Sequence, residues 1–255
     1  MKHFLRLLYE YCALYLGLGL LGVLCLIWMP AATILNFLLP SRQGAVLGRY
    51  AIMSGFHIYI GFLSLMGACR FDLSELDKLR GASPVIIAPN HPCLLDAVMV
   101  ISRLPNVTCI MKASLIDNFF LGAGARLAHY ICNDSTINMV VNAAASLQEG
   151  QHLLVFPEGT RTTQLPVNEF KGSIGLIARR AGVPVQSVFI ETDSAYLSKG
   201  WPLFRRPSMP ITYRVRLGRR FEPKDNVRSF TVELEQYFAD ELGMPVRQPE
   251  LPSVM

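Results

Sequence analysis

The stretch NHPCLLD (residues 90–96) places a histidine and an aspartate close together in a pattern that could do chemistry. Pro92 follows His91 directly. Because proline favours the first position of a helix, we expect a helix that begins at Pro92 and leaves His91 just outside it. The imidazole can then fold back toward Asp96. A carboxylate on one ring nitrogen fixes the tautomer and leaves the other nitrogen as a base. The stretch therefore predicts a His–Asp pair that acts without an enzyme nucleophile.

Other interpretations of this stretch stay open. His91 could simply cap the helix, with Asp96 a buried acid whose hydrogen bonds are satisfied. Cys93 could be a nucleophile, because a helix N-terminus can lower a thiol pKa, but it is so near His91 in sequence that it would have to turn back. A hydrolase based on Cys93 or on a serine is less favoured, since the chain has no G-x-S-x-G sequence.

The second candidate is VFPEGTRTT (residues 155–163), an apolar strand followed by a polar turn. Gly159 lets the backbone approach a ligand, Thr160 supplies a hydroxyl, and Arg161 carries a planar guanidinium that suits a phosphate. The alternative is a surface turn in which Glu158 pairs with Arg161. The first interpretation predicts that these four residues hold an anionic group.

Two lysines are further candidates for anion binding. Lys171, in EFKGS (residues 169–173), stands at the start of a predicted helix, where a positive charge is unfavourable unless an anion lies nearby. Lys112 ends a predicted strand. Alternatively, its side chain packs its apolar stem on the protein and extends its ammonium group into water.

Short apolar strands that alternate with helices must position these residues. We expect strands at 84–89, 107–112, 152–156, 184–191 and 211–218, helices at 92–104, 137–150, 174–182 and 229–243, and a helical stretch loosened by glycines at 114–129. This alternation predicts an α/β domain with a mostly parallel or mixed central sheet flanked by helices. Both candidate stretches directly follow a predicted strand, and sites in such folds gather at the carboxyl ends of strands.

Charged residues are scarce at the beginning of the chain. Of the 255 residues, 17% are charged, against about 25% in typical globular proteins. Residues 11–41 and 50–69 contain no Asp, Glu, Lys or Arg. We therefore expect residues 1–69 to form an N-terminal membrane anchor of one or two apolar helices. Residues 70–245 would form the catalytic domain and 246–255 a loose tail.

The first apolar run is long enough to cross a bilayer, which takes roughly 20 residues. Lys2 and Arg6 precede it and favour a cytoplasmic N-terminus. A spanning hairpin or two interfacial helices would both leave the catalytic domain facing the cytoplasm at the inner membrane. A cleaved signal peptide and a buried core helix are the alternatives.

The remaining composition narrows the possible partners. The net charge of +5 is modest and does not suggest nucleic acid. Paired arginines late in the chain form a solvated face or suit anionic lipid headgroups or an acidic carrier; they are Arg179, Arg180, Arg205, Arg206, Arg219 and Arg220. The six cysteines form no CxxC and no spacing typical of zinc ligands, so we expect no metal.

The two stretches resemble the motifs of a known family. NHPCLLD is similar to the HX4D motif, and FPEGTR matches the FPEGTR motif, of the PlsC-type glycerolipid acyltransferases, the lysophosphatidic acid acyltransferase-like family. GVPVQSV (residues 182–188) resembles that family's later V-P-V motif. The resemblance covers about residues 70–220, and apolar N-terminal helices are also similar to those of family members.

The resemblance implies transfer of a fatty acyl group to a hydroxyl. The donor would be an acyl-CoA or acyl-carrier-protein thioester, and the acceptor a 1-acylglycerol-3-phosphate or a related lipid alcohol. His91 would be the general base and Asp96 its orienting partner, and residues 158–161 would hold the acceptor's anionic group. Val183 and Pro184 would help to shape the acyl-donor side. Membrane lipids would be partners, and no metal or redox cofactor is implied.

One departure from the family concerns the acceptor. The family usually has an arginine, thought to help hold the acceptor phosphate, where this chain has YICNDST (residues 130–136), with Asn133 or Asp134 in its place. Lys112 and Arg161 remain, but a non-phosphate lipid acceptor becomes an alternative. A non-catalytic lipid-binding or assembly protein on the same scaffold is another. The sequence leaves the donor, the chain length and the oligomeric state open.

Overall fold

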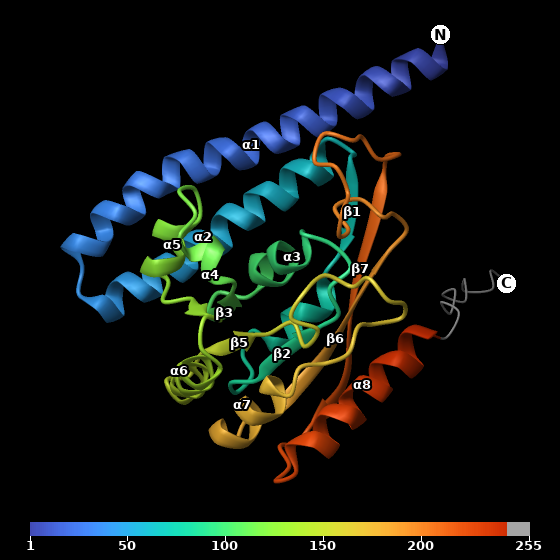
Figure 1. Ribbon diagram of the computed structural model, residues 1–255. Coiled ribbons are helices and arrows are strands. Elements are labelled where there is room, and N and C mark those ends of the chain that lie inside the picture. Colours follow the sequence, from blue (N-terminus) through green and yellow to red (C-terminus); the bar gives the residue numbers. More distant parts are fainter. Residues whose placement is uncertain (244–255) are drawn as a thin grey trace, which may run out of the picture.

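A central mixed β-sheet organises the computed structural model, which describes residues 1–243 (Figure 1). The predicted tail at 246–255 lies outside the described residues. The strand order is β1-β7-β6-β2-β5-β3-β4. The strands are β1 Cys69–Asp72, β2 Ile86–Pro89, β3 Val107–Met111, β4 Ile131–Cys132, β5 His152–Leu154, β6 Val185–Thr192 and β7 Ile211–Phe221. β7 runs antiparallel to β6 and parallel to β1, whereas β6, β2, β5, β3 and β4 are mutually parallel.

Helices cover both faces of the sheet. They are α1 Lys2–Leu38, α2 Ser41–Leu65, α3 Asp96–Arg103, α4 Ala113–Ile116, α5 Gly122–Leu127, α6 Thr136–Gln148, α7 Ser173–Ala181 and α8 Val227–Gly243, with a 3-10 helix at Ser74–Leu79. α6, α7 and α8 pack side by side on one face, while α2 packs on α3 and α1 lies over α2 and α5 on the other (Figure 1). The predicted α/β fold with two apolar N-terminal helices is confirmed.

The inner strands are apolar on both sides because both of their faces are covered. Along β2, Ile86 and Ala88 face the core beneath α6, α7 and α8, whereas Ile87 faces the core shared with α3. Leu153 and Leu154 of β5 divide in the same way. Such continuous apolar runs are typical of parallel strands buried between helix layers.

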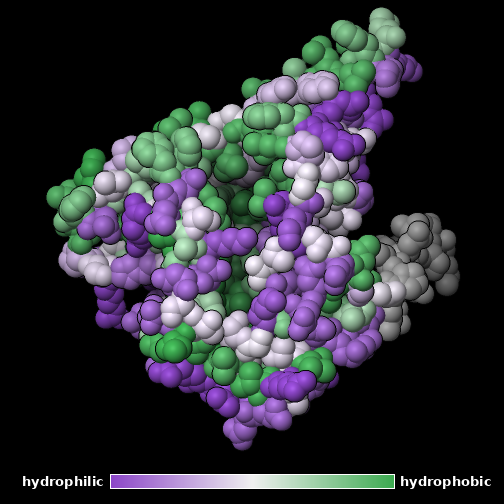
Figure 2. Space-filling model, in the orientation of Figure 1, coloured by the Kyte–Doolittle hydropathy of each residue, from purple (hydrophilic) through white to green (hydrophobic). Residues whose placement is uncertain are grey.

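The N-terminal helices share their core with the sheet. Ala13 and Leu14 of α1 and Tyr59 and Leu63 of α2 belong to the same buried cluster as Ile87. Nevertheless, many apolar side chains of α1 remain exposed, and Figure 2 shows much of its outer surface as hydrophobic. Residues 1–69 are therefore anchored to the domain along one side and uncovered along the other.

Some predicted boundaries are wrong. α3 begins at Asp96 instead of Pro92, because residues 92–95 form turns. α2 begins at Ser41, well before the apolar run that starts at residue 50. The stretch 114–129 contains two short helices, and the sequence did not predict β1 or β4.

Candidate active site

The two motif stretches meet at the carboxyl ends of neighbouring parallel strands. His91 follows β2, and the FPEGTR loop follows β5. Ile87 of β2 is level with Leu154 of β5, which is level with Cys109 of β3. Lys112 follows β3 and is therefore at the same edge of the sheet as His91. Both stretches were predicted to follow strands, and the structure brings these residues, distant in sequence, to one edge of the sheet.

His91 and Asp96 form the predicted pair. Nδ1 of His91 lies 2.8 Å from Oδ2 of Asp96. The Asp96 side chain is fully buried, whereas that of His91 is 16% exposed. With Nδ1 engaged as a donor to the carboxylate, Nε2 is the nitrogen left as a base.

A turn, and not the first turn of a helix, brings the two residues together. Oδ2 of Asp96 also accepts a hydrogen bond from the Cys93 backbone N–H, at 2.8 Å. The carboxylate thus closes the turn at residues 92–95 before α3 starts. Pro92 lies in this turn, so its preference for the first helical position is overridden.

The Cys93 thiol is a structural part of this pair. Its Sγ donates to Oδ1 of Asp96 at 3.0 Å. Burial raises the pKa of Cys93 well above its ordinary value, and the neighbouring Asp96 carboxylate raises it further. Because the thiolate is the nucleophilic form, this geometry argues against Cys93 as a nucleophile.

Two neighbouring residues hold His91 in place, one by contact with its ring and one through the strand that precedes it. The ring of Phe156, the first residue of FPEGTR, stacks on the imidazole with centroids 3.9 Å apart. Asn90 is buried and bridges β2 to β6, because its amide nitrogen donates to the Ile190 carbonyl (3.0 Å) while its Oδ1 accepts from the Ile190 N–H (2.7 Å). Neither residue could be given a role from the sequence, although Asn90 lies in NHPCLLD and Phe156 in FPEGTR.

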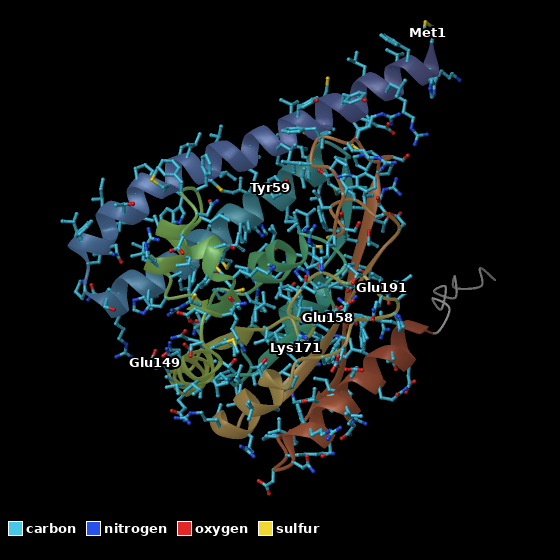
Figure 3. The ribbon with its side chains drawn as sticks, viewed as in Figure 1. Met1, Tyr59, Glu149, Glu158, Lys171 and Glu191 are labelled. Carbon is cyan, nitrogen blue, oxygen red and sulfur yellow. The ribbon has the colours of Figure 1, made fainter. Side chains whose placement is uncertain are left out.

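Glu158 joins the two motif loops from below the surface. It is 1% exposed, and Figure 3 shows it beside Lys171 near the centre of the molecule. Its Oε1 accepts from the His91 N–H (3.0 Å) and from the Thr162 hydroxyl (2.7 Å), and its Oε2 accepts from the Asn168 N–H (2.9 Å). Glu158 is therefore a positioning residue, and it does not pair with Arg161 as the alternative proposed.

The rest of the FPEGTR loop is also ordered by backbone contacts. Gly159 has φ +67°, a left-handed conformation that favours glycine. Thr160 follows it, half-buried. Nη1 of Arg161 donates to the carbonyls of Leu197 (2.9 Å) and Ser198 (2.8 Å), in the connection between β6 and β7. Part of the guanidinium predicted to bind an anion is therefore used to hold that connection.

The structure places the other predicted residues differently. Lys171 is exposed, and its stem lies over Gly159, so it belongs to the same loop as the motif. Val183 and Pro184 precede β6 and lie at the opposite edge of the sheet, since the Pro184 carbonyl accepts from the N–H of Ile86 at the start of β2. The predicted role of these two residues in shaping the acyl-donor side is not supported by this position, because it is at the edge of the sheet opposite to His91.

At the place of the family arginine, Asn133 has a local role. Its side-chain oxygen accepts from the Ala113 N–H at 3.2 Å and so caps the start of α4, directly beside Lys112. Oδ1 of Asp134 accepts a hydrogen bond from the N–H of the neighbouring Ser135 (2.7 Å).

A cavity of about 1040 Å³ lies beside the pair. Asn90 and Pro92, on either side of His91, contribute to its wall, together with Thr162, Thr163 and Ser198. Within residues 1–243, no group of three His, Cys, Asp or Glu side chains has the arrangement of a metal site.

The chain is similar to known acyltransferases. Residues 70–191 match the family model described as Acyltransferase. The chain is 27% identical over 124 residues to a probable 1-acyl-sn-glycerol-3-phosphate acyltransferase of Mycoplasma genitalium, covering 45% of this chain and 46% of that protein. It is 25% identical over 136 residues to the human 1-acyl-sn-glycerol-3-phosphate acyltransferase beta, covering 50% of this chain and 48% of that protein. The matched region thus spans about half the length of these curated relatives.

A solved structure shares the fold. The crystal structure of the 1-acyl-sn-glycerophosphate (LPA) acyltransferase PlsC from Thermotoga maritima superposes with a TM-score of 0.66 at 19% identity, covering 97% of this chain and 100% of that one. The family-model match over residues 70–191 and the curated relatives support a PlsC-type acyltransferase, and the solved structure shows the same α/β fold.

Proposed function

We propose that this protein is an O-acyltransferase that moves a fatty acyl group from a thioester to a hydroxyl of a lysophospholipid-like acceptor. The observation that carries the proposal is the hydrogen bond between His91 Nδ1 and the buried Asp96 carboxylate. The family assignment of residues 70–191 supports the reaction class. The names of the relatives support a glycerolipid acceptor such as 1-acylglycerol-3-phosphate.

In the proposed mechanism, Nε2 of His91 accepts the proton of the acceptor hydroxyl while the oxygen attacks the thioester carbonyl. The C–O bond forms, the C–S bond breaks, and the imidazolium returns the proton to the leaving thiolate. Asp96 stabilises the imidazolium from behind. General-base catalysis contributes typically about 10²–10⁴-fold, so alignment of thioester and hydroxyl must supply much of the rest.

Positive groups on the same side of the sheet support an anionic acceptor. Lys112 is exposed at the end of β3, and Lys171 is exposed over the FPEGTR loop. Arg161 uses Nη1 for the carbonyls of residues 197 and 198, which leaves its other N–H donors for a ligand. The proposed donor is a thioester, either of coenzyme A or of acyl carrier protein.

A second candidate is the same transfer to a lipid alcohol without a phosphate. The observation that favours it is Asn133, which caps α4 at the place where the family has an arginine. This leaves Lys112 as the cation next to that position. A neutral or zwitterionic headgroup would need fewer positive partners there.

The apolar N-terminal helices support work at a membrane. Both α1 and α2 are long and apolar enough to cross a bilayer by length and composition alone. However, Tyr9 near the start of α1 donates to the Met66 carbonyl (2.9 Å), and Trp28 near its other end packs on α5. Because α1 touches the domain near both ends, we infer that it lies along the membrane interface, with the domain on the cytoplasmic side.

The test is transfer of a labelled acyl group by the purified full chain. Wild type and His91→Ala would be assayed with acyl-CoA and acyl-carrier-protein donors on lysophosphatidic acid and on a phosphate-free lipid alcohol. We expect His91→Ala to lower kcat about 10²–10⁴-fold, whereas His57→Ala, at an exposed histidine of α2, should not.

The outcomes separate the candidates. Transfer to lysophosphatidic acid supports the first function, and transfer only to the phosphate-free alcohol supports the second. Full activity of His91→Ala would refute the role of His91 as the general base. No transfer by wild type with either donor would favour a lipid-binding protein without catalysis.

A further inference from the structure

The connection between β6 and β7 carries an exposed loop with an unusual composition. Residues 199–206 read KGWPLFRR, and we call them the basic–aromatic loop. Leu203 and Phe204 are 47% and 63% exposed, and Lys199 and Arg205 are also exposed. The loop lies beyond the residues that match the family model, which end at 191. Two exposed apolar side chains between basic ones call for a partner that is both apolar and anionic.

Internal contacts hold the loop in a defined shape. The Trp201 indole N–H donates to the Arg205 carbonyl at 3.0 Å. The Arg205 guanidinium lies 4.9 Å from the Trp201 ring centroid, over its face. Arg206 forms an ion pair with the buried Glu10 of α1. The loop is therefore pre-organised, so that little ordering is needed when a partner binds.

The loop continues the apolar surface of α1. Phe204 stacks with Tyr15 of α1, with ring centroids 6.3 Å apart. Around that contact, Leu8, Tyr11 and Tyr15 on α1 are exposed. Figure 1 shows the connection, drawn in orange, reaching α1 near its N-terminal half. Helix and loop thus present one surface from two segments far apart in the sequence.

The free charge on this surface is positive. Within residues 1–243, neither Lys199 nor Arg205 forms an ion pair, whereas Arg206 and Arg6 share the single carboxylate of Glu10. Tryptophan and basic side chains beside apolar ones are typical of segments at membrane interfaces. Each Lys or Arg near an anionic bilayer surface adds to its attraction.

We propose that the basic–aromatic loop docks on the surface of an anionic lipid bilayer, next to α1. Leu203 and Phe204 enter the acyl boundary, Trp201 lies at the level of the headgroups, and Lys199 and Arg205 contact lipid phosphates. An acidic carrier protein would meet the same charges. The continuity of the exposed apolar side chains with α1 favours the bilayer. The proposal concerns lipid binding and does not require the transfer reaction.

Fluorescence tests the position of the loop directly, because the chain has 2 tryptophans. The variant Trp28→Phe leaves Trp201 as its sole tryptophan. With vesicles of equimolar phosphatidylcholine and phosphatidylglycerol, we expect doxyl-labelled lipids to quench the fluorescence of Trp201. We also expect acrylamide in the water to quench Trp201 less than it does in the absence of vesicles. Acrylamide quenching that is unchanged by vesicles, with no quenching by labelled lipid, would overturn the proposal.

Vesicle affinity tests the charges. The double variant Lys199→Gln/Arg205→Gln should bind the mixed vesicles about 25-fold more weakly, about fivefold for each charge, with little change on phosphatidylcholine alone. The control Arg179→Gln/Arg180→Gln removes the same charge from the end of α7 and should bind like wild type. Unchanged affinity of the loop variant would refute the lipid contact. If the loop variant kept its vesicle affinity but had a raised KM for an acyl-carrier-protein thioester, the loop would instead be a binding site for the carrier protein.

Discussion

Replacing Asp96 by asparagine should remove the charge behind His91 while its hydrogen bonds are kept. Oδ2 of Asp96 accepts from His91 Nδ1 and from the Cys93 N–H, both at 2.8 Å, and an amide oxygen can accept the same two bonds. The amide nitrogen would then face Cys93 Sγ, which now donates to Oδ1 at 3.0 Å and can rotate its proton away to accept. Asp96→Asn therefore isolates the effect of the negative charge.

The expected loss follows from the difference between a charged and a neutral hydrogen bond. A hydrogen bond to a charged group contributes about 1.5–3 kcal/mol against about 0.5–1.5 kcal/mol for a neutral one, so removing only the charge loses about 1–1.5 kcal/mol, and each ~1.36 kcal/mol of activation free energy is tenfold in rate. We expect kcat of Asp96→Asn to fall about 5- to 13-fold with little change in the KM of the acceptor. Steady-state transfer assays beside His91→Ala measure this. A folded Asp96→Asn variant with wild-type kcat would refute the role of the carboxylate.

The stability of the same variant should change in the opposite direction. Burial raises the pKa of Asp96, although hydrogen bonds from His91 and Cys93 oppose the shift. The native carboxyl then holds its proton more tightly than the unfolded one, so the free energy of unfolding falls as pH rises from the ordinary pKa through the raised one. An asparagine side chain is neutral, so its burial does not carry the cost of burying a charge. At neutral pH, Tm of Asp96→Asn should equal or exceed that of wild type, and a much lower Tm would contradict this reasoning.

Three further substitutions test the surroundings of the pair. Cys93→Ser should keep activity within about threefold, because a hydroxyl can replace the thiol as donor, and loss of transfer together with iodoacetamide sensitivity would favour a nucleophile. Glu158→Gln should lower the free energy of unfolding by about 1–3 kcal/mol and also lower kcat, because an amide group would face a donor; Glu169→Gln, at an exposed position, is the control in thermal unfolding. Glu10→Gln should lower the free energy of unfolding by about 2 kcal/mol, measured by denaturant unfolding. This is less than the ~3–5 kcal/mol of a fully buried pair, because the Arg206 side chain is 30% exposed. Unchanged stability would contradict the importance of this pair.

The sheet and the meeting of the two motifs could be predicted because both depend on local patterns. The apolar runs at β2 and β5 mark buried strands, and parallel strands bring the residues that follow them to one edge. β1 and β4 were missed because they are short and gain their place by pairing. β1, for example, pairs Cys69 with Ile211, far along the chain. No local pattern contains such a partner.

The roles of single side chains were harder to predict. The start of α3 depends on a bond from the Cys93 N–H to Asp96, a tertiary detail that outweighs the preference of Pro92. Glu158 was predicted to bind an anion, but burial and three donors make it a positioning residue. Composition indicates that a carboxylate is present in the turn, whereas only the fold shows which donors surround it.

The connection between β6 and β7 links the helix α1 to both motifs. Leu197 has φ +60°, a left-handed conformation that costs a leucine about 1–2 kcal/mol. Its carbonyl accepts from the Leu94 N–H (3.2 Å) and from Arg161 (2.9 Å), so contacts with both motif loops hold this conformation. Further along the same connection, Arg206 pairs with Glu10. Under the proposed function, the β6–β7 connection therefore sets both the position of α1 at the membrane and the position of Arg161. Weakening the Glu10–Arg206 pair should raise the KM of a bilayer-borne acceptor more than that of a short-chain, water-soluble one, and equal changes would show that the two ends of the connection act independently.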